Sequence, residues 1–368
     1  MSKIHIALVG GQTIPVYMGI LDVHPDRVLL VYSEQTPQEA KRIQDVVGLN
    51  HPEIVFEESL KLDPVELAEI YRKAETCFAQ MDEADELSVN ISGGTKSWTL
   101  AFFDVFKRRA STTLFYVDQN NNCWNLITHK KHQITETLNI DTRLRLYGNV
   151  LEEYTKFTVL TTDDLNCAKS IRRLRRKHPG VFNKLIKYEN AGTKLPNDSS
   201  ITWNEDKTAA EVVMKTPKFS VKEKLKSKLL PDMLLNTGWF EIEVANLISR
   251  WGKAREIWIN CVFKAKDTMT KNEIDMIVDT GTKLLFVECK TQIFDTTAID
   301  KFKSAVSNYS GMSSMAILIT DAPLNERSIE KCDDNKILHF SLNQGSSLLP
   351  ADKLLFALLD NKLFNIKP

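Results

Sequence analysis

The chain has 368 residues, 43% of them hydrophobic and 8% aromatic, a composition typical of a globular protein with room for two domains. Its 48 basic and 48 acidic residues cancel, which excludes nucleic-acid binding driven by bulk charge and leaves only local patches for that purpose. The six cysteines form no Cys-x-x-Cys pair and the seven histidines do not cluster with them, so neither a zinc site nor a disulfide framework is expected. The absence of a signal peptide or a long apolar run predicts a cytoplasmic protein without a membrane segment.

Strands and helices alternate over the first 120 residues. Apolar runs predict strands over 4–9, 27–32, 54–56, 87–91 and 113–118, and helices are expected over 37–47, 64–80 and 96–109. An asparagine-rich turn between 115–118 and 123–127 predicts a terminal hairpin. This order indicates an α/β fold with a mostly parallel, doubly wound sheet, which binds ligands at the carboxyl ends of its strands.

Glycine-rich loops follow the first and fourth predicted strands, at that edge of the sheet. They read Gly10-Gly11-Gln12-Thr13 and Ser92-Gly93-Gly94-Thr95-Lys96. The second loop opens a helix, so its amides would face an anion while Lys96 adds positive charge. Neither loop is a Walker A loop or a dinucleotide fingerprint, and the alternative is that the glycines serve only as tight turns.

The pattern Asn-x-Ser-Gly-Gly-Thr-Lys at 90–96, with the Gly-Gly-Gln-Thr loop, resembles the CARF domain, the Rossmann-fold sensor of CRISPR systems, over residues 1–146. The resemblance implies a homodimer that binds a cyclic oligoadenylate, with cyclic tetraadenylate as the expected ring. A ring with two-fold symmetry would meet one copy of each loop per subunit. The second loop is expected to bind phosphate or ribose, with Thr95 on a 2′-hydroxyl, while Gln12 and Thr13 contact an adenine or ribose.

Residues 147–230 match neither this pattern nor the one that follows, and are treated as an intervening segment. Two stretches are strongly basic, at 172–178 and 215–228. A run of charge is usually a solvated face, but a phosphate-binding surface is favoured if the C-terminal part acts on nucleic acid. The small and polar residues at 190–200 predict a loop.

Residues 234–248 predict an amphipathic helix whose apolar positions are Phe240, Val244, Leu247 and Ile248. Glu241 and Glu243 are two residues apart and cannot share a face, so one faces the sheet and the other is solvated. The sequence alone leaves the choice open.

Two short apolar runs then carry charged residues at their ends. Asp275 lies at the end of the first run, Glu288 and Lys290 close the second, and Thr280-Gly281-Thr282 predicts a hairpin turn between them. Pairing the strands brings Asp275 and Glu288 together, and Glu288 and Lys290 share a face. Two carboxylates and an ammonium group suit a Mg²⁺ or Mn²⁺ site for phosphodiester hydrolysis, whereas the simpler alternative is a solvated ion pair.

The order helical Glu, Asp, Glu-x-Lys resembles the PD-(D/E)xK restriction-endonuclease-like superfamily over about 231–341, with Ile274-Asp275 in place of Pro-Asp. The resemblance implies a nuclease domain over 231–368 in which Asp275, Glu288 and Glu241 hold the metal, with Glu243 as the fallback. Lys290 would orient the attacking water or stabilise the developing charge. Gln292 corresponds to a glutamine often found beyond the lysine.

Together, the two ends resemble the ancillary nucleases of type III CRISPR antiviral defence. The resemblance implies a metal-dependent endonuclease that cyclic oligoadenylate activates allosterically. Its substrate would be single-stranded DNA, single-stranded RNA or supercoiled DNA, and the sequence does not choose among them. Two alternatives stay open. One is an ungated restriction or repair endonuclease, and the other is a nucleotide sensor that binds nucleic acid without cutting.

Overall fold

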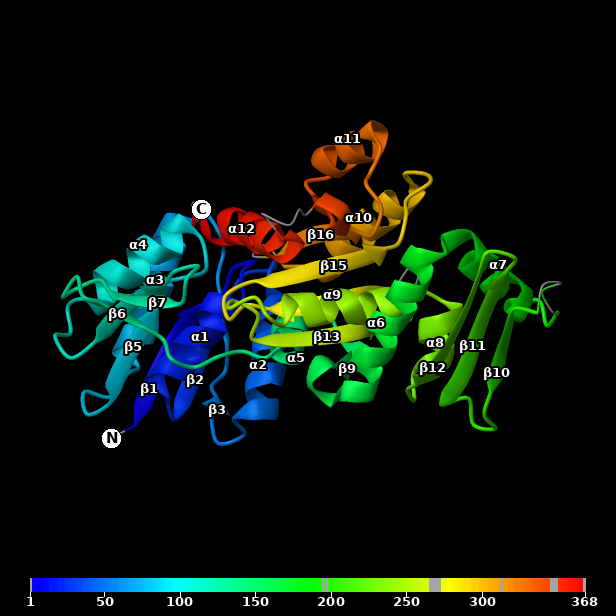
Figure 1. Cartoon of the computed structure of the whole chain (residues 1–368). Coiled ribbons are helices and arrows are strands. Elements are labelled where there is room, and N and C mark those ends of the chain that lie inside the picture. The colour runs from blue at the N-terminus through cyan, green and yellow to red at the C-terminus, as the bar shows by residue number, and fades with distance from the viewer. Residues whose placement is uncertain are drawn as a thin grey trace. The chain divides into compact units, whose positions relative to one another are not determined.

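A computed structural model of the chain describes residues 2–193, 195, 198–264, 273–311, 314–344 and 350–366. Its contacts divide the protein into two compact units, labelled by element in Figure 1. Unit 1 comprises Met1–Val150 and Tyr309–Ser313, and unit 2 comprises Leu151–Asn308 and Ser314–Pro368. Within the described residues, no helix is both long enough and apolar enough to cross a membrane.

Unit 1 contains an α/β sheet covered by helices. Its elements are β1 (Lys3–Leu8), α1 (Ile14–Val23), β2 (Arg27–Tyr32), α2 (Pro37–Asn50), β3 (Val55–Phe56), β4 (Leu60–Lys61), α3 (Leu67–Ala79), β5 (Glu86–Asn90), α4 (Lys96–Phe106), β6 (Thr113–Val117), β7 (Asn122–Asn125), β8 (Lys131–Gln133) and α5 (Ile140–Leu146). The strand order is β3-β2-β1-β5-β6-β7-β8, with β4 also pairing with β2. Strands up to β6 are parallel, and β7 and β8 are antiparallel, which confirms the predicted hairpin.

The side chains of the central strands alternate between two apolar cores. Ala7 and Val9 pack with α1 and α2, whereas Ile6 and Leu8 pack with α3 and α4. Burial on both faces explains why these strands are continuous apolar runs. Because β1 and β5 are parallel neighbours, the loops that follow them lie at the same edge of the sheet.

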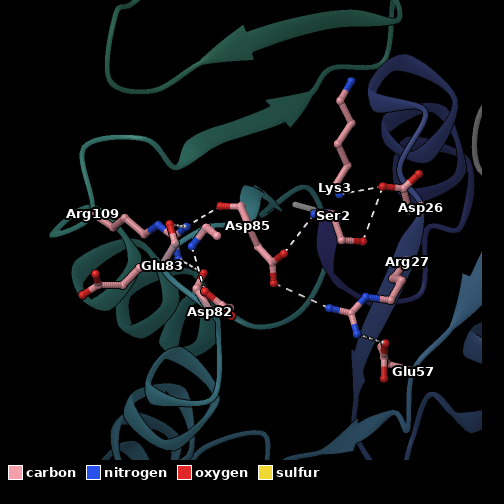
Figure 2. A network of polar contacts seen from close by, with 10 residues as sticks. Ser2, Lys3, Asp26, Arg27, Glu57, Asp82, Glu83, Asp85 and Arg109 are labelled. Carbon is pink, nitrogen blue, oxygen red and sulfur yellow. Dashed lines mark hydrogen bonds and ion pairs between the residues drawn. The ribbon is translucent and has the colours of Figure 1, made fainter.

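The opposite edge of this sheet is tied by a polar network, shown in Figure 2. The Lys3 amide donates to Asp26 at 2.8 Å, and Arg27 at the start of β2 lies 3.6 Å from Asp85, just before β5. Arg109 donates to the backbone carbonyls of Asp82 and Glu83 at 2.9 and 2.8 Å. These contacts hold the amino ends of β1, β2 and β5, so this edge is committed to structure.

Unit 2 contains two sheets. Its elements are β9 (Leu151–Lys156), η1 (Phe157–Val159), α6 (Thr162–Lys177), α7 (Pro179–Asn190), β10 (Ser200–Trp203), β11 (Ala209–Thr216), β12 (Phe219–Lys226), α8 (Leu230–Leu235), α9 (Gly238–Ile248), β13 (Glu256–Phe263), β14 (Glu273–Asp279), β15 (Leu284–Lys290), α10 (Thr297–Tyr309), β16 (Met315–Thr320), α11 (Glu326–Asp334), β17 (Leu338–Ser341), η2 (Leu342–Gln344) and α12 (Ala351–Phe364). The larger sheet has the order β17-β16-β15-β14-β13-β9, and β10-β11-β12 form a separate antiparallel sheet.

The observed units correct the predicted domain boundaries. Residues 151–230 belong to unit 2 and are not a separate segment between domains. The physical reason is that β9 extends the larger sheet by pairing with β13, and one continuous core joins α6, α7 and β11 to α9 and the strands of that sheet. The predicted loop at 190–200 separates α7 from β10, although Lys194, Pro196 and Asn197 lie outside the described residues.

Candidate functional sites

The two glycine-rich loops of unit 1 lie against each other through their backbones. A Cβ atom on Gly93 would lie 2.2 Å from the Leu8 carbonyl oxygen and 2.8 Å from the Gly10 amide nitrogen. A Cβ on Gly10 would lie 2.9 Å from the Gly94 amide. Glycine is therefore required at this contact because no side chain fits between the loops. At Gly94 the backbone φ of +76° also favours glycine.

Helix α4 begins directly after the second loop. The Thr95 hydroxyl accepts a hydrogen bond from the Trp98 amide at 3.3 Å and caps the helix, while Lys96 is exposed. The indole of Trp98 is buried and donates to the Asp63 carbonyl at 2.8 Å, which fixes the first turn. The amides of this turn and the Lys96 ammonium form an electropositive helix start, suited to a phosphate.

Asn90, the last residue of β5, joins the second loop to the start of α1. Its side-chain oxygen accepts from the Ser92 amide at 2.9 Å and from the Ser92 hydroxyl, and its Nδ2 donates to the Pro15 carbonyl at 3.1 Å. The Val117 amide donates to the Ser92 hydroxyl at 2.7 Å. A Cβ on Gly19 would lie 2.1 Å from Asn90 Nδ2, so α1 has a glycine where the amide packs. The Ser92 hydroxyl therefore organises the loop.

Thr13 and Gln12 differ in what they offer to a ligand. The Thr13 side chain is buried, and its hydroxyl donates to the Leu146 carbonyl at 2.9 Å. The expected contact of Thr13 with adenine or ribose is corrected to a loop-positioning role, because the hydroxyl is directed into the protein. Gln12 and Gly11 are exposed at the same edge.

In unit 2, the predicted acidic and basic groups meet on β14 and β15, which are antiparallel and joined by a turn at Gly281. The Lys290 ammonium lies 3.2 Å from Asp275 Oδ2 and 2.9 Å from Glu288 Oε1. Asp275 Oδ2 also accepts from the Cys289 amide at 2.7 Å. Asp275 is 7% exposed and Glu288 is 2% exposed, so these charges are not the solvated surface pair that was the alternative.

The predicted helix over 234–248 is interrupted at Asn236 and Thr237, which separate α8 from α9. The expected apolar face is buried as predicted. Glu243 forms an ion pair with Arg172 at 2.9 Å, whereas Glu241 interacts electrostatically with Asp275 and Lys290. The Arg172 ion pair of Glu243 and the charges that act on Glu241 therefore favour Glu241 over Glu243 as the helical carboxylate of the cluster.

Burial and neighbouring carboxylates shift the pKa values of Glu241 and Lys290 in the cluster. Burial, together with the charges of Asp275 and Asp232, raises the pKa of Glu241 from 4.5 to about 8. Burial by itself lowers the pKa of Lys290, but Asp275 and Glu288 outweigh it, and the net shift is upward. The ammonium group therefore stays charged while Glu241 holds a proton at neutral pH.

This donor set fits a hard divalent cation. Three carboxylates, from α9, β14 and β15, offer the oxygen ligands that Mg²⁺ and Mn²⁺ prefer. The Cys289 carbonyl, which accepts from Lys290 at 3.1 Å, lies beside them. Gln292 is exposed and lies beyond the end of β15, so strand alternation does not place it with Lys290.

The basic run at 172–178 is largely neutralised inside unit 2. Besides Arg172, the arginines of α6 form ion pairs with Glu223 and Asp321. Asp321 follows β16, and its amide donates to the Lys290 carbonyl at 3.2 Å. Because three carboxylates engage the four arginines, with Asp321 shared by Arg175 and Arg176, most of the charge on which the phosphate-binding interpretation rested is used inside unit 2.

A comparison with protein families assigns unit 1 to a known domain family. Residues 4–142 match the family model of the Card1 CARF domain. Unit 1 is a CARF domain. No match was found among curated proteins.

Solved structures extend the likeness to the whole chain. Can2 from Sulfobacillus thermosulfidooxidans, solved with cyclic tetra-adenylate, has 18% identity and a TM-score of 0.70, covering 98% of this chain and 99% of Can2. Protein VC1899 from Vibrio cholerae has 15% identity and a TM-score of 0.73, covering 98% of each chain. A type III CRISPR defence DNA nuclease activated by cyclic oligoadenylate has 16% identity and a TM-score of 0.58, covering 95% of this chain and 50% of that chain. At these identities the likeness establishes the fold, and it confirms the predicted class of an α/β CARF domain joined to a second α/β domain.

Two site residues were absent from the sequence prediction. Asn90 belongs to the motif of the CARF resemblance, but only the structure shows that its amide joins the second loop to the start of α1. Asp232 on α8 adds negative charge near Glu241, and a Cβ on Gly238 would lie 2.0 Å from its carboxylate. A glycine at the start of α9 was the available signal for this close approach.

Proposed function

We propose that this protein is a nuclease of type III CRISPR defence that is activated by a cyclic oligoadenylate and depends on a divalent metal. The observation that carries the proposal is the position of Lys290, whose ammonium lies within 3.2 Å of both Asp275 and Glu288 at the ends of neighbouring strands. The CARF domain supports the regulatory part, and the Can2 and CRISPR nuclease folds support the pairing of sensor and nuclease.

The proposed activator site is the contact between the two CARF loops. Gly93, Gly94 and the α4 amides present donors to a phosphate or ribose, and Lys96 supplies a positive charge beside them. Gln12 lies on the other loop and would contact a base or ribose. Cyclic tetraadenylate has two-fold symmetry, so a homodimer would present each loop twice, once to each half of the ring.

In the nuclease site, Asp275, Glu288 and Glu241 would hold Mg²⁺ or Mn²⁺, which supplies Lewis-acid stabilisation of the negative charge that develops on phosphorus oxygens. Lys290 would orient the attacking water or donate to a non-bridging oxygen. Glu241 must lose its proton to serve as a ligand, so metal binding and proton release are coupled. The burial of Asp275 and Glu288 keeps water from competing at the site.

Activation would be a shift in population between a resting and a cutting arrangement of the two units, because a ligand acts only through its difference in affinity for two states. The test is a cleavage assay on single-stranded RNA, single-stranded DNA and supercoiled plasmid, with and without cyclic tetraadenylate, in Mn²⁺ or EDTA. Cutting that needs both ligand and metal supports the proposal. Equal cutting without ligand indicates an ungated endonuclease, and no cutting under any condition indicates a sensor that only binds nucleic acid.

A further inference from the structure

Three side chains able to bind a transition metal meet in the CARF domain, away from the contact between the two loops. Asp22 lies near the end of α1, Cys123 lies on β7 and His132 lies on β8. The sequence separates them widely, so no ligand spacing is visible and the sequence predicted no zinc site. The fold brings them together because β8 pairs with β7, and Cys123 of β7 lies in the same apolar core as α1.

The geometry of this cluster is well defined. Cys123 and His132 are direct partners in the antiparallel β7–β8 ladder, so both side chains project from the same face. The His132 Nε2 atom lies 2.8 and 3.0 Å from the two carboxylate oxygens of Asp22. The Sγ, nitrogen and carboxylate oxygen atoms of the three residues all lie within 4.8 Å of one another.

We propose that Asp22, Cys123 and His132 form a zinc site that joins α1 to the β7–β8 hairpin. A thiolate, an imidazole and a carboxylate are the three ligand types that Zn²⁺ accepts, and the mixture of soft and hard donors excludes Mg²⁺ and Ca²⁺ as preferred ions. The bound state is electrically balanced, since two negative ligands and one neutral imidazole meet a charge of +2. A water molecule would complete the tetrahedron.

Binding requires two defined proton movements, one from the Cys123 thiol and one from His132 Nε2. Burial, followed by the neighbouring charge of Asp22, raises the pKa of the Cys123 thiol to about 12, so without metal the sulfur stays protonated. Formation of the Zn–S bond breaks the S–H bond and releases that proton to solvent, with no change of oxidation state. Without metal, the Nε2–H of neutral His132 points at Asp22. On binding, that proton moves to Nδ1 by exchange with solvent, the freed Nε2 lone pair bonds to zinc, and the Asp22 carboxylate turns from the imidazole to the metal.

The competing explanation is an ordinary Asp22–His132 ion pair with a buried thiol nearby. His132 has a side-chain exposure of 59%, and such a pair contributes little to stability. The two explanations differ in what zinc does. Only the metal site holds the hairpin to α1 through bonds to all three side chains, and only it makes the CARF domain more stable when zinc is added.

The experiment uses the full chain with the nuclease cluster disabled by Asp275→Asn and Glu288→Gln, so that zinc bound there is not counted. After equilibration with Zn²⁺ and desalting, elemental analysis should find about one zinc per chain. Replacement by Co²⁺ should give a thiolate charge-transfer absorption band. His132→Gln, at an exposed position, and Cys123→Ser should each lower zinc affinity at least roughly tenfold, because each removes a direct ligand.

Cys77→Ser is the matched control, because Cys77 is another buried thiol of the same unit and lies on α3. It should keep both the zinc and the cobalt band. Zinc content that is unchanged in His132→Gln, or a cobalt spectrum without thiolate character, overturns the proposal. If Cys123→Ser does not fold, the His132 variant still decides, and these outcomes do not depend on whether the chain cuts nucleic acid.

Discussion

Replacing Gly93 by alanine places a methyl group between the two CARF loops. The added Cβ lies 2.2 Å from the Leu8 carbonyl oxygen and 2.8 Å from the Gly10 amide, and both are backbone atoms that cannot rotate away. Carbon and oxygen atoms approach to about 3.3 Å at closest, so the loops must separate by about 1 Å. We expect both weaker binding of cyclic tetraadenylate and lower stability of the CARF domain.

The magnitude follows from the kind of clash. Overpacking that moves backbone costs about 1–3 kcal/mol, and a unit of this size loses roughly 2–4 °C of Tm per kcal/mol. Gly48→Ala is the matched control, because its Cβ meets nothing within 4 Å in the exposed part of α2. That substitution should raise stability by about 0.5–1 kcal/mol.

Scanning calorimetry measures both variants, and the transition that cyclic tetraadenylate shifts identifies the CARF domain. Titration calorimetry gives the ligand affinity of each. A Gly93→Ala protein that unfolds at the wild-type temperature and binds the ring with wild-type affinity would refute the inference that the loop contact is tight and forms the ligand site.

Three further predictions concern single side chains. Glu288→Gln should lower metal-dependent cutting at least roughly 100-fold, while titration calorimetry finds unchanged affinity for cyclic tetraadenylate. Normal cutting by this variant would contradict the proposed role of Glu288 as a metal ligand. Lys96→Ala should weaken that affinity roughly tenfold or more with an unchanged circular dichroism spectrum, because an exposed charged donor is lost; equal affinity would exclude Lys96. Glu241 has a pKa of about 8 in the fold and 4.5 as its ordinary value, so the folded state binds the extra proton between these pH values. The stability of unit 2, measured by urea unfolding, should therefore fall as the pH increases from 4.5 to 8. The affinity for Mn²⁺, measured by metal titration, should rise over the same pH range. Glu241→Gln should flatten both curves and Glu243→Gln should not; the opposite result would exchange their roles.

Local chemistry was sufficient to predict most strands of unit 1, the β14–β15 hairpin with its charged residues, and the two glycine-rich loops. Continuous apolar runs mark strands buried on both faces, and the Gly-Gly pairs mark a contact without room for side chains. Helix α1 was not predicted, because its residues 16–21 are buried on every side and give no amphipathic period. Its interior Gly19 also lowers helix propensity, and the reason for that glycine is the amide of Asn90, which is 71 positions away.

The remaining differences come from contacts between residues distant in sequence. The basic run of α6 has the pattern of an exposed patch, and its carboxylate partners lie up to 146 positions away. The hydroxyl of Thr13 finds the Leu146 carbonyl 133 positions away. Strand β9 is mostly polar, and its pairing with β13 shows only once the larger sheet is assembled. A single sequence carries no signal for such partners.

The ion pairs of α6 also determine how salt should affect the binding of nucleic acid. A phosphate that approached Arg175 or Arg176 would have to displace the carboxylate of Asp321, which lies 3.2 and 3.0 Å from them. The phosphate would release a counterion, but the displaced carboxylate would take one up, so the exchange releases no net counterion. These arginines should therefore not steepen the dependence of affinity on salt concentration. For this helix, basic composition reflects ion pairs within unit 2 and does not measure how strongly the protein holds a polyanion.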